Sequence, residues 1–526
     1  MTLRSLPSVR TLALAAVLAT GAFFSFAGQA LASSGQFSIM QDDRLFINSG
    51  GPVQQQAVAD TAALGPHIIH VVINWRNLAP NPNSTHKPTG VNLSSPAAYD
   101  AGKWDAYDNL VRFAQASTPR LDVLYSAAGP APEWALKCSK SEKRKYGKVK
   151  GTCKPDPTLY GQFVRALGTR YSGNYPDENV PGNLPRVTRW SIWNEPDLPS
   201  WLSPQIVKKG RTKTDIGAMV YRNLAYSALS AFQATGHTAG RDTILLGETA
   251  PIGGSGANAT PQQFYQGVFC LDSRGHRLRG KAAKTLGCKK KLKRMNVSGI
   301  AHHPYTRGAF TNLLSKQKSG NATIAYIPRL LHILHQGAHA KVISSAASKR
   351  IYWTEFGVSS RPPAAARKGV SLATQAEWIN QMQFISYLSR NVQSVVQFQL
   401  SDDANLSQAA GGKGTFQTGL RFADNSGKPA LDAYRVPLYV LDIGHGKLEI
   451  WGGARPATGL QGQTIRILNG NTTVKTVTLG RNGYFLTTLP KRGGTWRLQW
   501  TSPFGQVFTS RTAKAVKKKK AIASRK

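Results

Sequence analysis

Between residues 37 and 438, short apolar runs alternate with longer segments in which apolar residues recur at helical spacing. The short runs predict eight strands, and the segments between them predict eight helices. The predicted strands are Phe37–Met40, Ile68–Ile73, Leu121–Tyr125, Thr188–Trp193, Thr243–Leu246, Gly299–Ala301, Ile351–Thr354 and Val395–Leu400. The predicted helices are Val53–Ala63, Ala98–Gln115, Thr158–Tyr171, Asp215–Ala234, Pro261–Cys270, Ala325–His335, Leu372–Arg390 and Pro429–Leu438.

This alternation favours an α/β fold with a parallel sheet, because each helix must carry the chain back to the start of the next strand. Eight such units within about 400 residues predict a (β/α)8 TIM barrel over residues 33–441. The alternative is a doubly wound open sheet. That fold favours a glycine-rich turn after its first strand, and none follows the early runs of this chain.

The whole chain has 526 residues, which is too many for one hydrophobic core, so a further domain is expected. The pattern of apolar residues changes in its last part. From Lys447 onward, strands follow one another without helices between them. The dipeptides Asn469-Gly470 and Asn482-Gly483 are strong hairpin signals. We therefore predict a small all-β sandwich over residues 442–511.

Two features of this last part bear on function. Its tryptophans either fill the core of the sandwich, which their spacing along the strands favours, or bind carbohydrate; they are Trp451, Trp496 and Trp500. Residues 512–526 lack apolar periodicity, so we expect a basic disordered tail there.

The first 32 residues predict a secretory signal peptide. Arg4 and Arg10 give it a positive start, Leu12–Phe26 is apolar, and Ala30-Leu31-Ala32 matches a cleavage site. The alternative is an uncleaved membrane anchor, which the small residues at the cleavage site disfavour. No later stretch is long and apolar enough to span a bilayer. We therefore expect a secreted protein, extracellular or associated with the cell envelope.

Export makes disulfides possible, and the four cysteines fall into two close pairs, Cys138/Cys153 and Cys270/Cys288. Four cysteines allow three connectivities, of which pairing within each close pair is the simplest. A zinc site is not expected, because neither pair has the short C-x-x-C spacing or the nearby histidines of such a site.

The net charge is +41, from 67 lysines and arginines against 26 acidic residues. Much of the positive charge lies in runs, at Lys140–Lys150, Lys289–Arg294 and Lys517–Lys520. This balance suggests attraction to anionic cell-envelope polymers or acidic polysaccharide, and its simpler explanation is solubilising charge. Nucleic acid is not an expected partner of a secreted chain.

Two of the eight glutamates in the chain end apolar strands that are rich in aromatic residues. Glu195 ends the run from Trp190 and is followed by Pro196, which has no N–H to donate to a strand ladder; Glu355 ends the run from Ile351. In a (β/α)8 barrel the carboxyl ends of the strands surround one mouth, where active sites lie. Two carboxylates that face each other across a cleft are what cleavage of a glycosidic bond requires. Either glutamate alone could instead serve an ion pair or a helix cap.

The residues around these glutamates resemble a known family. The stretch Trp193-Asn194-Glu195-Pro196 resembles the acid/base motif of clan A of the retaining glycoside hydrolases, whose catalytic glutamates lie on strands four and seven. The stretch Thr354-Glu355-Phe356-Gly357 resembles the nucleophile motif of that clan, and His303-Pro304-Tyr305 is similar to its His-x-Tyr pair. The run of motifs is most similar to families 39 and 5 and covers about Ser33 to Leu441.

The resemblance implies a role for each of these residues. Glu195 would be the general acid/base, and Glu355 would be the nucleophile that forms a glycosyl-enzyme. Asn194 would hydrogen-bond the sugar hydroxyl next to the anomeric carbon. Tyr305 would hydrogen-bond the Glu355 carboxylate, and His303 would line the adjoining subsite. Neither a metal nor an organic cofactor is expected, since two carboxylates suffice for the reaction.

The two roles need different surroundings. The acid needs a raised pKa, which an apolar neighbour such as Trp193 can supply by desolvation. The nucleophile must stay ionised, which hydroxyl and N–H donors favour. Retention further requires the two carboxyl groups about 5–5.5 Å apart, against roughly 6.5–9.5 Å for inversion. The sequence leaves the inverting alternative open.

Other residues are candidates for binding the substrate. Glu248 closes the fifth strand and would be a third carboxylate at the mouth, where it contacts substrate, orients Glu195 or serves the fold alone. Four tryptophans that follow or end strands would either stack on sugar rings or fill the core; they are Trp75, Trp134, Trp201 and Trp353. Asp402 and Asp403 resemble the acidic position that often follows the last strand in this clan.

Two positions depart from the pattern of the clan. His70 stands on the second strand, where related barrels usually carry arginine. Gln397-Phe398-Gln399 occupies the eighth strand, where a tryptophan usually lies near the sugar. Both departures concern recognition of the sugar, so neither the sugar nor the linkage follows from the sequence.

We therefore predict a secreted glycoside hydrolase that cleaves a poly- or oligosaccharide by a retaining mechanism. The alternative is a non-catalytic barrel that binds cell-surface polysaccharide and is held at the envelope by its charge. The loop between Cys138 and Cys153 follows the third strand, so its lysines would rim the mouth and favour an acidic glycan.

Overall fold

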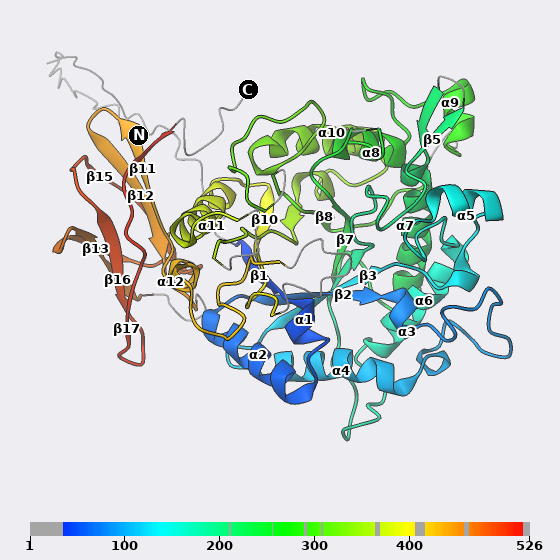
Figure 1. Cartoon of the computed structure of the whole chain (residues 1–526), viewed down its shortest axis with the longest axis horizontal. Coiled ribbons are helices and arrows are strands. Elements are labelled where there is room, and N and C mark those ends of the chain that lie inside the picture. Colours follow the sequence, from blue (N-terminus) through cyan, green and yellow to red (C-terminus); the bar gives the residue numbers. More distant parts are fainter. Residues whose placement is uncertain are drawn as a thin grey trace, which may run out of the picture. The chain divides into compact units, whose positions relative to one another are not determined.

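A closed ring of parallel strands is the central feature of the fold in a computed structural model of this protein (Figure 1). The structure describes residues 35–209, 212–254, 256–288, 292–306, 309–362, 369–404, 416–456 and 462–518. Within these ranges the barrel has eight strands, in the order β1-β10-β9-β8-β7-β4-β3-β2. They are β1 (Phe37–Gln41), β2 (Ile68–Asn74), β3 (Asp122–Ala128), β4 (Arg189–Ile192), β7 (Thr243–Thr249), β8 (Gly299–His302), β9 (Ile351–Trp353) and β10 (Val392–Phe398).

The register confirms both the predicted strands and the closure of the ring. Phe37 of β1 pairs with Ser394 of β10, and Ile39 of the same strand pairs with Ile68 of β2, so β1 joins the two ends of the sheet. The strands are nearly continuous apolar runs because barrel strands are covered on both faces. The (β/α)8 prediction is correct, and the open-sheet alternative is excluded.

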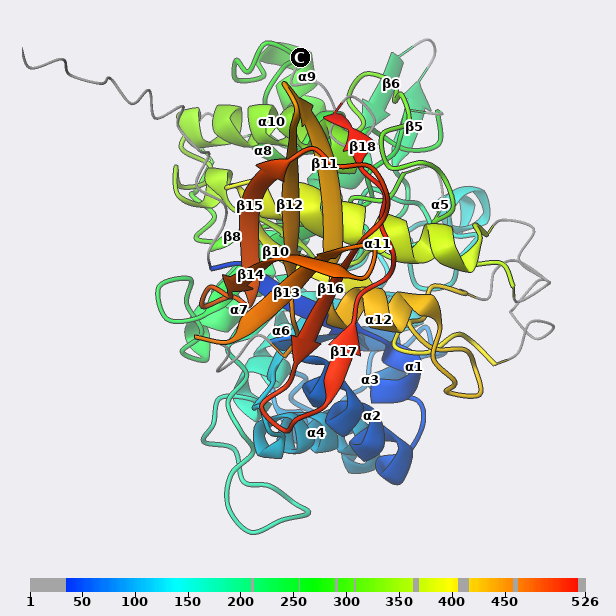
Figure 2. The same cartoon turned by 90° about the vertical axis from the view of Figure 1, so that its left-hand side faces the viewer.

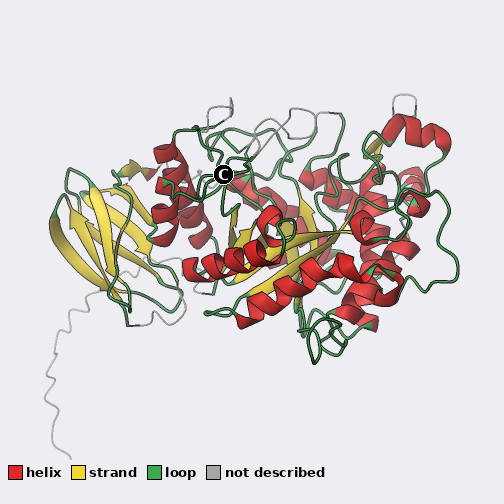
Figure 3. Ribbon diagram, turned by 60° about the horizontal axis from the view of Figure 1, so that its bottom comes forward, coloured by secondary structure: helices red, strands yellow, loops and turns green. Residues whose placement is uncertain are grey.

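Helices surround the barrel, and each predicted helix is present with ends shifted by a few residues (Figure 3). They are α2 (Gly51–Leu64), α4 (Ala101–Ala116), α6 (Pro157–Arg170), α7 (Ile216–Ala234), α8 (Pro261–Phe269), α10 (Ile327–His339), α11 (Leu372–Tyr387) and α12 (Pro429–Arg435). Their starts follow from local chemistry. The side chains of Asp100, Asp156 and Ser371 cap α4, α6 and α11, and Pro157 occupies the first turn of α6.

Several short elements were not predicted, because they lie in polar loops without apolar periodicity. The helices are α1 (Asp43–Phe46), α3 (Trp75–Leu78), α5 (Lys140–Tyr146) and α9 (Gly280–Thr285). Short 3-10 turns are η1 (Pro96–Ala98), η2 (Glu133–Ala135), η3 (Ile324–Tyr326) and η4 (Ala347–Lys349). Strands β5 (Ile206–Lys209) and β6 (Thr212–Asp215) form an antiparallel hairpin after β4.

The two cysteine pairs form the predicted local disulfides, Cys138–Cys153 and Cys270–Cys288. Helix α5 lies inside the first disulfide loop and α9 inside the second. Across the described ranges, we find no helix with the length and hydropathy needed to cross a bilayer.

The last part of the chain forms two sheets that pack as a sandwich (Figure 2). Within the described residues their strand orders are β15-β12-β11-β18 and β14-β13-β16-β17. The strands are β11 (Leu438–Gly444), β12 (Lys447–Gly453), β13 (Thr464–Asn469), β14 (Thr472–Thr478), β15 (Tyr484–Pro490), β16 (Trp496–Thr501), β17 (Val507–Thr509) and β18 (Val516–Lys517). Trp451, Trp496 and Trp500 are buried, so these rings belong to the interior, as the strand spacing favoured.

Two predicted boundaries of this part need correction. The sandwich begins at Leu438 of β11 rather than at residue 442, because Leu438 already pairs with Gly452. The segment from Thr512 is not disordered throughout: Ala513 is buried and bridges to Trp496, and β18 pairs with β11. This short strand carries too few apolar residues to show a period. The rest of the tail and the predicted signal peptide lie outside the described residues.

The sandwich is bonded to the barrel through α11, α12 and the start of β1. Phe384 of α11 stacks on Tyr439, with ring centroids 5.0 Å apart. The side-chain amide of Asn380 donates to the Ala433 carbonyl, and its oxygen accepts from the Leu438 N–H. The buried guanidinium of Arg455 donates to Ser38 Oγ at 2.6 Å. These bonds hold the end of the barrel and the start of the sandwich in one compact unit.

Candidate active site at the carboxyl ends of the strands

Glu195 lies directly after β4, on a backbone that turns sharply. Trp193 has a φ of 68° and Glu195 a φ of 37°, left-handed conformations that cost roughly 1–3 kcal/mol each for residues other than glycine. The Glu195 N–H donates to the Glu248 carbonyl at 3.0 Å. The ring of Trp193 is fully buried, and a Cβ atom at Gly129 would come within 2.4 Å of it. Packing of the tryptophan therefore holds the glutamate in its strained position.

Glu355 lies directly after β9, the seventh strand of the barrel. Its side chain is 17% exposed and that of Glu195 is 18% exposed, so solvent reaches both carboxylates. One atom, His303 Nδ1, lies 3.1 Å from Glu195 Oε1 and 4.0 Å from Glu355 Oε2. The fold thus brings the two predicted glutamates close to one imidazole nitrogen.

The Glu355 carboxylate accepts hydrogen bonds from two sides. The Tyr305 hydroxyl donates to Oε1 at 3.2 Å, the contact that the resemblance implied, and Gln41 Nε2 donates to Oε2 at 3.4 Å. Burial and the nearby charge of Glu195 raise the pKa of Glu355, although the positive charge of His303 opposes them. Phe356 stacks on Tyr305 at 5.4 Å between ring centroids and fixes the direction of the hydroxyl.

Asn194 is held by its neighbours on both ends of the amide. Its hydrogen-bond partners orient it so that the nitrogen donates to Glu248 Oε2 at 3.0 Å and the oxygen accepts from Trp201 Nε1 at 3.2 Å. The side chain is almost fully buried. One N–H of the amide donates to Glu248, so the second N–H remains for another acceptor. Asn194 is thus fixed by a residue of β7 and by a residue of the segment after β4.

Glu248, the predicted third carboxylate, lies at the mouth but is fully buried. Its Oε1 lies 3.1 Å from His70 Nε2 in an ion pair between two unexposed side chains, and its Oε2 accepts from Ser126 Oγ at 3.1 Å. His70 therefore supplies a positive charge at the position on strand two where the resemblance led us to expect arginine. Both oxygens of Glu248 thus face groups of the protein in this structure.

His303 follows β8 and is also fully buried. Burial alone would lower the pKa of His303. The charges of Glu355, Glu195 and Glu248, with the hydrogen bond to Glu195, outweigh burial and raise this pKa to about 9. The ring was expected to line a sugar subsite, but its two nitrogens face carboxylates instead. The neighbouring His302 differs, because burial and its neighbour lower its pKa to about 3.

The predicted stacking tryptophans occupy the interior rather than an open surface. Trp75 is fully buried and stacks on Phe163 of α6 at 5.5 Å, and Trp353 is fully buried as well. Trp134 is 7% exposed and packs edge-on against Trp75. Neither Trp75 nor Trp353 has a face exposed for stacking in this structure, and α6 covers Trp75. Trp201, which is half-buried, is the candidate beside Asn194.

Three further polar residues at the site escaped the sequence analysis. Gln41 ends β1 and Ser126 lies in β3, and both donate to glutamates of the site. Asp197 is fully buried and accepts from the Ala250 N–H at 2.9 Å; burial raises its pKa well above its usual range. The signal in the sequence that could have identified Gln41 and Ser126 is a polar residue near the carboxyl end of an otherwise apolar strand.

The acidic pair after the last strand is structural in part. Asp402 forms a buried ion pair with Lys428, 2.6 Å between Oδ1 and Nζ. Asp403 accepts from Gln399 Nε2 at 2.7 Å and from the Phe416 N–H at 2.8 Å. Both carboxylates are thus occupied by groups of the protein itself.

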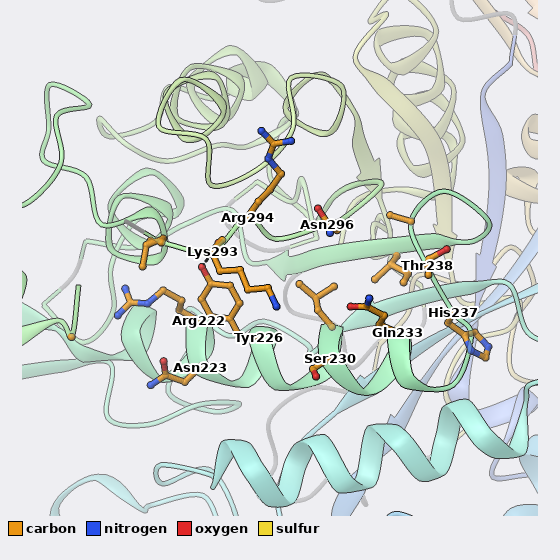
Figure 4. A pocket seen from close by; sticks show the side chains of 15 residues that line it. Arg222, Asn223, Tyr226, Ser230, Gln233, His237, Thr238, Lys293, Arg294 and Asn296 are labelled. Atoms are coloured by element: carbon orange, nitrogen blue, oxygen red, sulfur yellow. Dashed lines mark hydrogen bonds between the residues drawn. The ribbon is translucent and has the colours of Figure 1, made fainter. Parts of the chain in front are cut away.

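A cavity of about 530 Å³ lies away from the glutamates, on the outer side of α7 (Figure 4). Ile244 at the amino end of β7 lines it, so it opens at the end of the barrel opposite to the mouth. The buried Arg222 at one end of the cavity donates to the carbonyls of Gly267 and Leu286, which close α8 and α9. Its charge therefore serves these two helix ends, and the cavity is separate from the candidate site.

Comparison with known proteins bears on the fold. Neither a protein-family model nor a curated protein matches this sequence. Among solved structures, a glucosidase from Croceicoccus marinus is similar with a TM-score of 0.50 and 10% identity, over 92% of this chain and 97% of that one. A family 39 glycoside hydrolase from the gut symbiont Bacteroides cellulosilyticus WH2 has a TM-score of 0.45 and 12% identity, over 88% of this chain and 80% of that one. At 10% identity, the likeness to the glucosidase supports the barrel fold alone.

Proposed function

We propose that this protein is a glycoside hydrolase that cleaves O-glycosidic bonds of a poly- or oligosaccharide by a retaining double displacement. The observation that carries the proposal is the convergence of two solvent-accessible carboxylates, Glu195 and Glu355, on the single nitrogen His303 Nδ1. They come from the ends of the fourth and seventh strands and lie at the mouth of a (β/α)8 TIM barrel, where active sites are found. The barrels to which the chain is similar include a glucosidase and a family 39 glycoside hydrolase.

The roles of the two carboxyl groups in the proposed reaction come from the resemblance and from their positions on the fourth and seventh strands. The pKa of Glu355 is raised to about 6, whereas the nucleophile was expected from the sequence to be the more readily ionised group. Glu355 attacks the anomeric carbon while Glu195 gives its proton to the departing oxygen, and a glycosyl-enzyme forms. Glu195 then removes a proton from water, which attacks the same carbon and releases Glu355. Tyr305 and Gln41 stabilise the ionised form of Glu355 by donating to its two oxygens. The free N–H of Asn194 is the donor for the adjacent sugar hydroxyl.

The contacts with His303 set an upper limit on the distance between the two carboxylates. Since both approach the same atom, Glu195 Oε1 and Glu355 Oε2 can be no farther apart than 3.1 Å and 4.0 Å placed end to end. This limit allows the separation of about 5–5.5 Å that retention uses and also the lower end of the range of roughly 6.5–9.5 Å that inversion uses. The retaining mechanism in this proposal therefore rests on the resemblance of the two glutamate motifs, and the anomer of the product tests it.

The proposal includes secretion and a carbohydrate partner. Two disulfides fit an oxidising compartment, and the signal peptide predicted for the first 32 residues is the proposed route. Attraction of the basic loops to anionic envelope polymers is a further part of the proposal.

The test is hydrolysis of a panel of neutral and acidic polysaccharides by the wild-type protein, Glu195→Gln and Glu355→Gln. We expect hydrolysis by the wild type and a loss of at least about a thousandfold in each variant. Proton NMR of the first product should show the anomer of the substrate. Undiminished activity in both variants would refute the assignment, and the opposite anomer would indicate inversion. Binding of a polysaccharide without any hydrolysis would favour the non-catalytic alternative.

A further inference from the structure

Glu248 owes its position to an irregularity of β7. The register between β7 and β8 shifts between Gly247 and Thr249, so Glu248 is an extra residue in the strand. Its φ of 119° is unusual for a residue with a side chain. Bulges of this kind redirect a side chain near active sites. Here the bulge turns the carboxylate into the interior beneath Glu195.

The buried carboxylate and the backbone of Glu248 contact most of the groups that surround Glu195. Its Oε2 accepts from the Asn194 amide at 3.0 Å and lies 4.0 Å from His303 Nε2. Its Oε1 lies 3.1 Å from His70 Nε2. Its backbone carbonyl accepts from the Glu195 N–H at 3.0 Å. One residue therefore touches the sugar-binding amide, both site histidines and the backbone of the acid/base.

The carboxyl groups of the site outnumber its imidazoles. Three carboxyl groups face His70 and His303 within a largely buried site. If every group is charged, one negative charge remains, and a single proton shared by Glu195 and Glu355 removes it. That shared proton is the one that an acid catalyst must donate. Loss of charge from an imidazole would leave two carboxylates facing each other without a cation between them.

We propose that Glu248 is a positioning residue for the glycosidase reaction: an ionised, buried carboxylate that fixes Asn194 and keeps His303 protonated between Glu195 and Glu355. The inference rests on the proposed function of the two glutamates and assigns no contact with substrate to Glu248. Burial would raise the pKa of Glu248, but the charges of His70 and His303 lower it, in agreement with this role. A glutamine at this position keeps the size of the side chain, removes the charge and replaces one acceptor oxygen by an N–H donor.

Other titratable groups face this cluster and are part of its electrostatics. They lie on α1, α6 and α7, after β4, in β8 and on the segment that continues β8. They are Asp43, Tyr160, Tyr221, Asp197, His302 and Tyr305. Removal of the Glu248 charge makes protons on the neighbouring groups easier to lose. The pH dependence of the reaction should therefore move to lower pH at its alkaline side.

The first test follows the protonation of His303 directly. In wild-type protein labelled with ¹⁵N-histidine, NMR should show His303 as an imidazolium at pH 7 and His302 as a neutral ring; His303→Gln assigns the signal. In Glu248→Gln, the titration midpoint of His303 should fall by about one pH unit or more. A neutral His303 at pH 7 in the wild type would overturn the proposal without any need for a variant to fold.

The second test uses the pH profile of the reaction. In Glu248→Gln, kcat should fall roughly tenfold to a hundredfold, KM should change much less, and the alkaline limb should move to lower pH. Asp108→Asn is the matched control, because Asp108 is a buried carboxylate paired with Arg170 on helices outside the site. It should lower stability and leave the limb in place.

The outcomes separate this inference from the proposed function. Full activity of Glu195→Gln and Glu355→Gln would contradict the proposed function itself. Inactive glutamate variants together with a wild-type profile in Glu248→Gln would overturn the role of Glu248 alone. A fall in kcat with an unmoved alkaline limb and an unmoved His303 midpoint would reduce Glu248 to a residue that only stabilises the fold.

Discussion

Tyr305 donates its hydroxyl hydrogen to Glu355 Oε1 at 3.2 Å, and this contact gives the clearest prediction about the nucleophile. In Tyr305→Phe the hydrogen bond to the carboxylate is lost while the stacking on Phe356 remains possible. A hydrogen bond to a charged group contributes about 1.5–3 kcal/mol, so kcat should fall roughly tenfold to a hundredfold. The acidic limb of the pH profile should move to higher pH, because the ionised form of Glu355 loses a donor.

The control for this prediction is Tyr171→Phe. Tyr171 also donates to a buried carboxylate, Asp108 Oδ1 at 2.9 Å, but it lies on the helix side of the barrel. Tyr171→Phe should lower the midpoint of thermal unfolding without a change in the acidic limb of the pH profile. An unchanged limb in Tyr305→Phe would show that Glu355 is not the group whose ionisation limits activity at low pH.

Stability should depend on pH through His303. The pKa of His303 is raised to about 9 in the folded protein, because the carboxylates outweigh burial, whereas a histidine in an unfolded chain titrates near about 6.5. The folded state thus binds this proton more tightly. The contribution is fully present below about pH 6.5 and is lost as the pH rises through about 9. Its size is of the order of 3 kcal/mol.

The measurement is the free energy of unfolding from pH 6 to pH 10 for the wild type and for His303→Gln. The difference between the two proteins should shrink over this range as His303 loses its proton in the wild type. His302→Gln is the comparison, since the neutral ring of His302 has no proton to lose there. A difference that stays constant with pH would contradict a protonated His303.

The barrel could be predicted because its strands are covered on both faces. That burial makes β2, from Ile68 to Asn74, a nearly unbroken apolar run, which the flanking helices set apart. The hairpin of β5 and β6 could not be predicted in the same way, since it is rich in lysine and lies in a loop. The strand β18 was missed because two residues show no period.

The site divides along similar lines. Glu195 and Glu355 were found because each stands where an apolar run ends, and the fold sets such ends around one mouth. The burial of Trp75 and Glu248 could not be read from the chain. It depends on packing by α6 and on a bulge in β7, which arise from contacts between elements far apart in sequence.

The disulfide loops offer a prediction that separates stability from function. Cys138–Cys153 closes a loop with a separation of 15 residues and Cys270–Cys288 one of 18. Replacing both cysteines of either pair by serine should cost about 3 kcal/mol of unfolding free energy. The loop between Cys138 and Cys153 is hydrogen-bonded to the segment that carries Trp201. The hydroxyls of Thr152 and Ser203 lie 3.0 Å apart.

Activity should therefore respond to the two pairs differently. The Cys138→Ser/Cys153→Ser protein should lose activity at a temperature where it is still folded, because Trp201 holds Asn194. The Cys270→Ser/Cys288→Ser protein should keep its activity at the same residual stability. Equal losses of activity in the two proteins would show that the first loop has no part in positioning Asn194.

The basic loop between Cys138 and Cys153 gives the prediction about substrate charge. Lys143 and Lys154 pair with Glu133 and Glu142. Four of the exposed cationic residues of the loop are Lys140, Arg144, Lys148 and Lys150. Because the loop follows β3, these charges would attract an acidic polymer toward the mouth. Replacing the four by glutamine should raise KM for a uronic-acid polymer at low salt and leave KM for a neutral polymer nearly unchanged.

A second set of four exposed cations provides the control for this effect. They lie in the other disulfide loop and are Arg274, Arg279, Lys281 and Lys284. Their replacement removes the same net charge, so it should change KM for the acidic polymer much less if the position of the charge matters. Salt should abolish the advantage of the wild type, since charges separated by more than about 10 Å are largely screened at 0.1 M. Equal effects of the two sets on KM would show that the loop acts only through the net charge of the protein and not through its position.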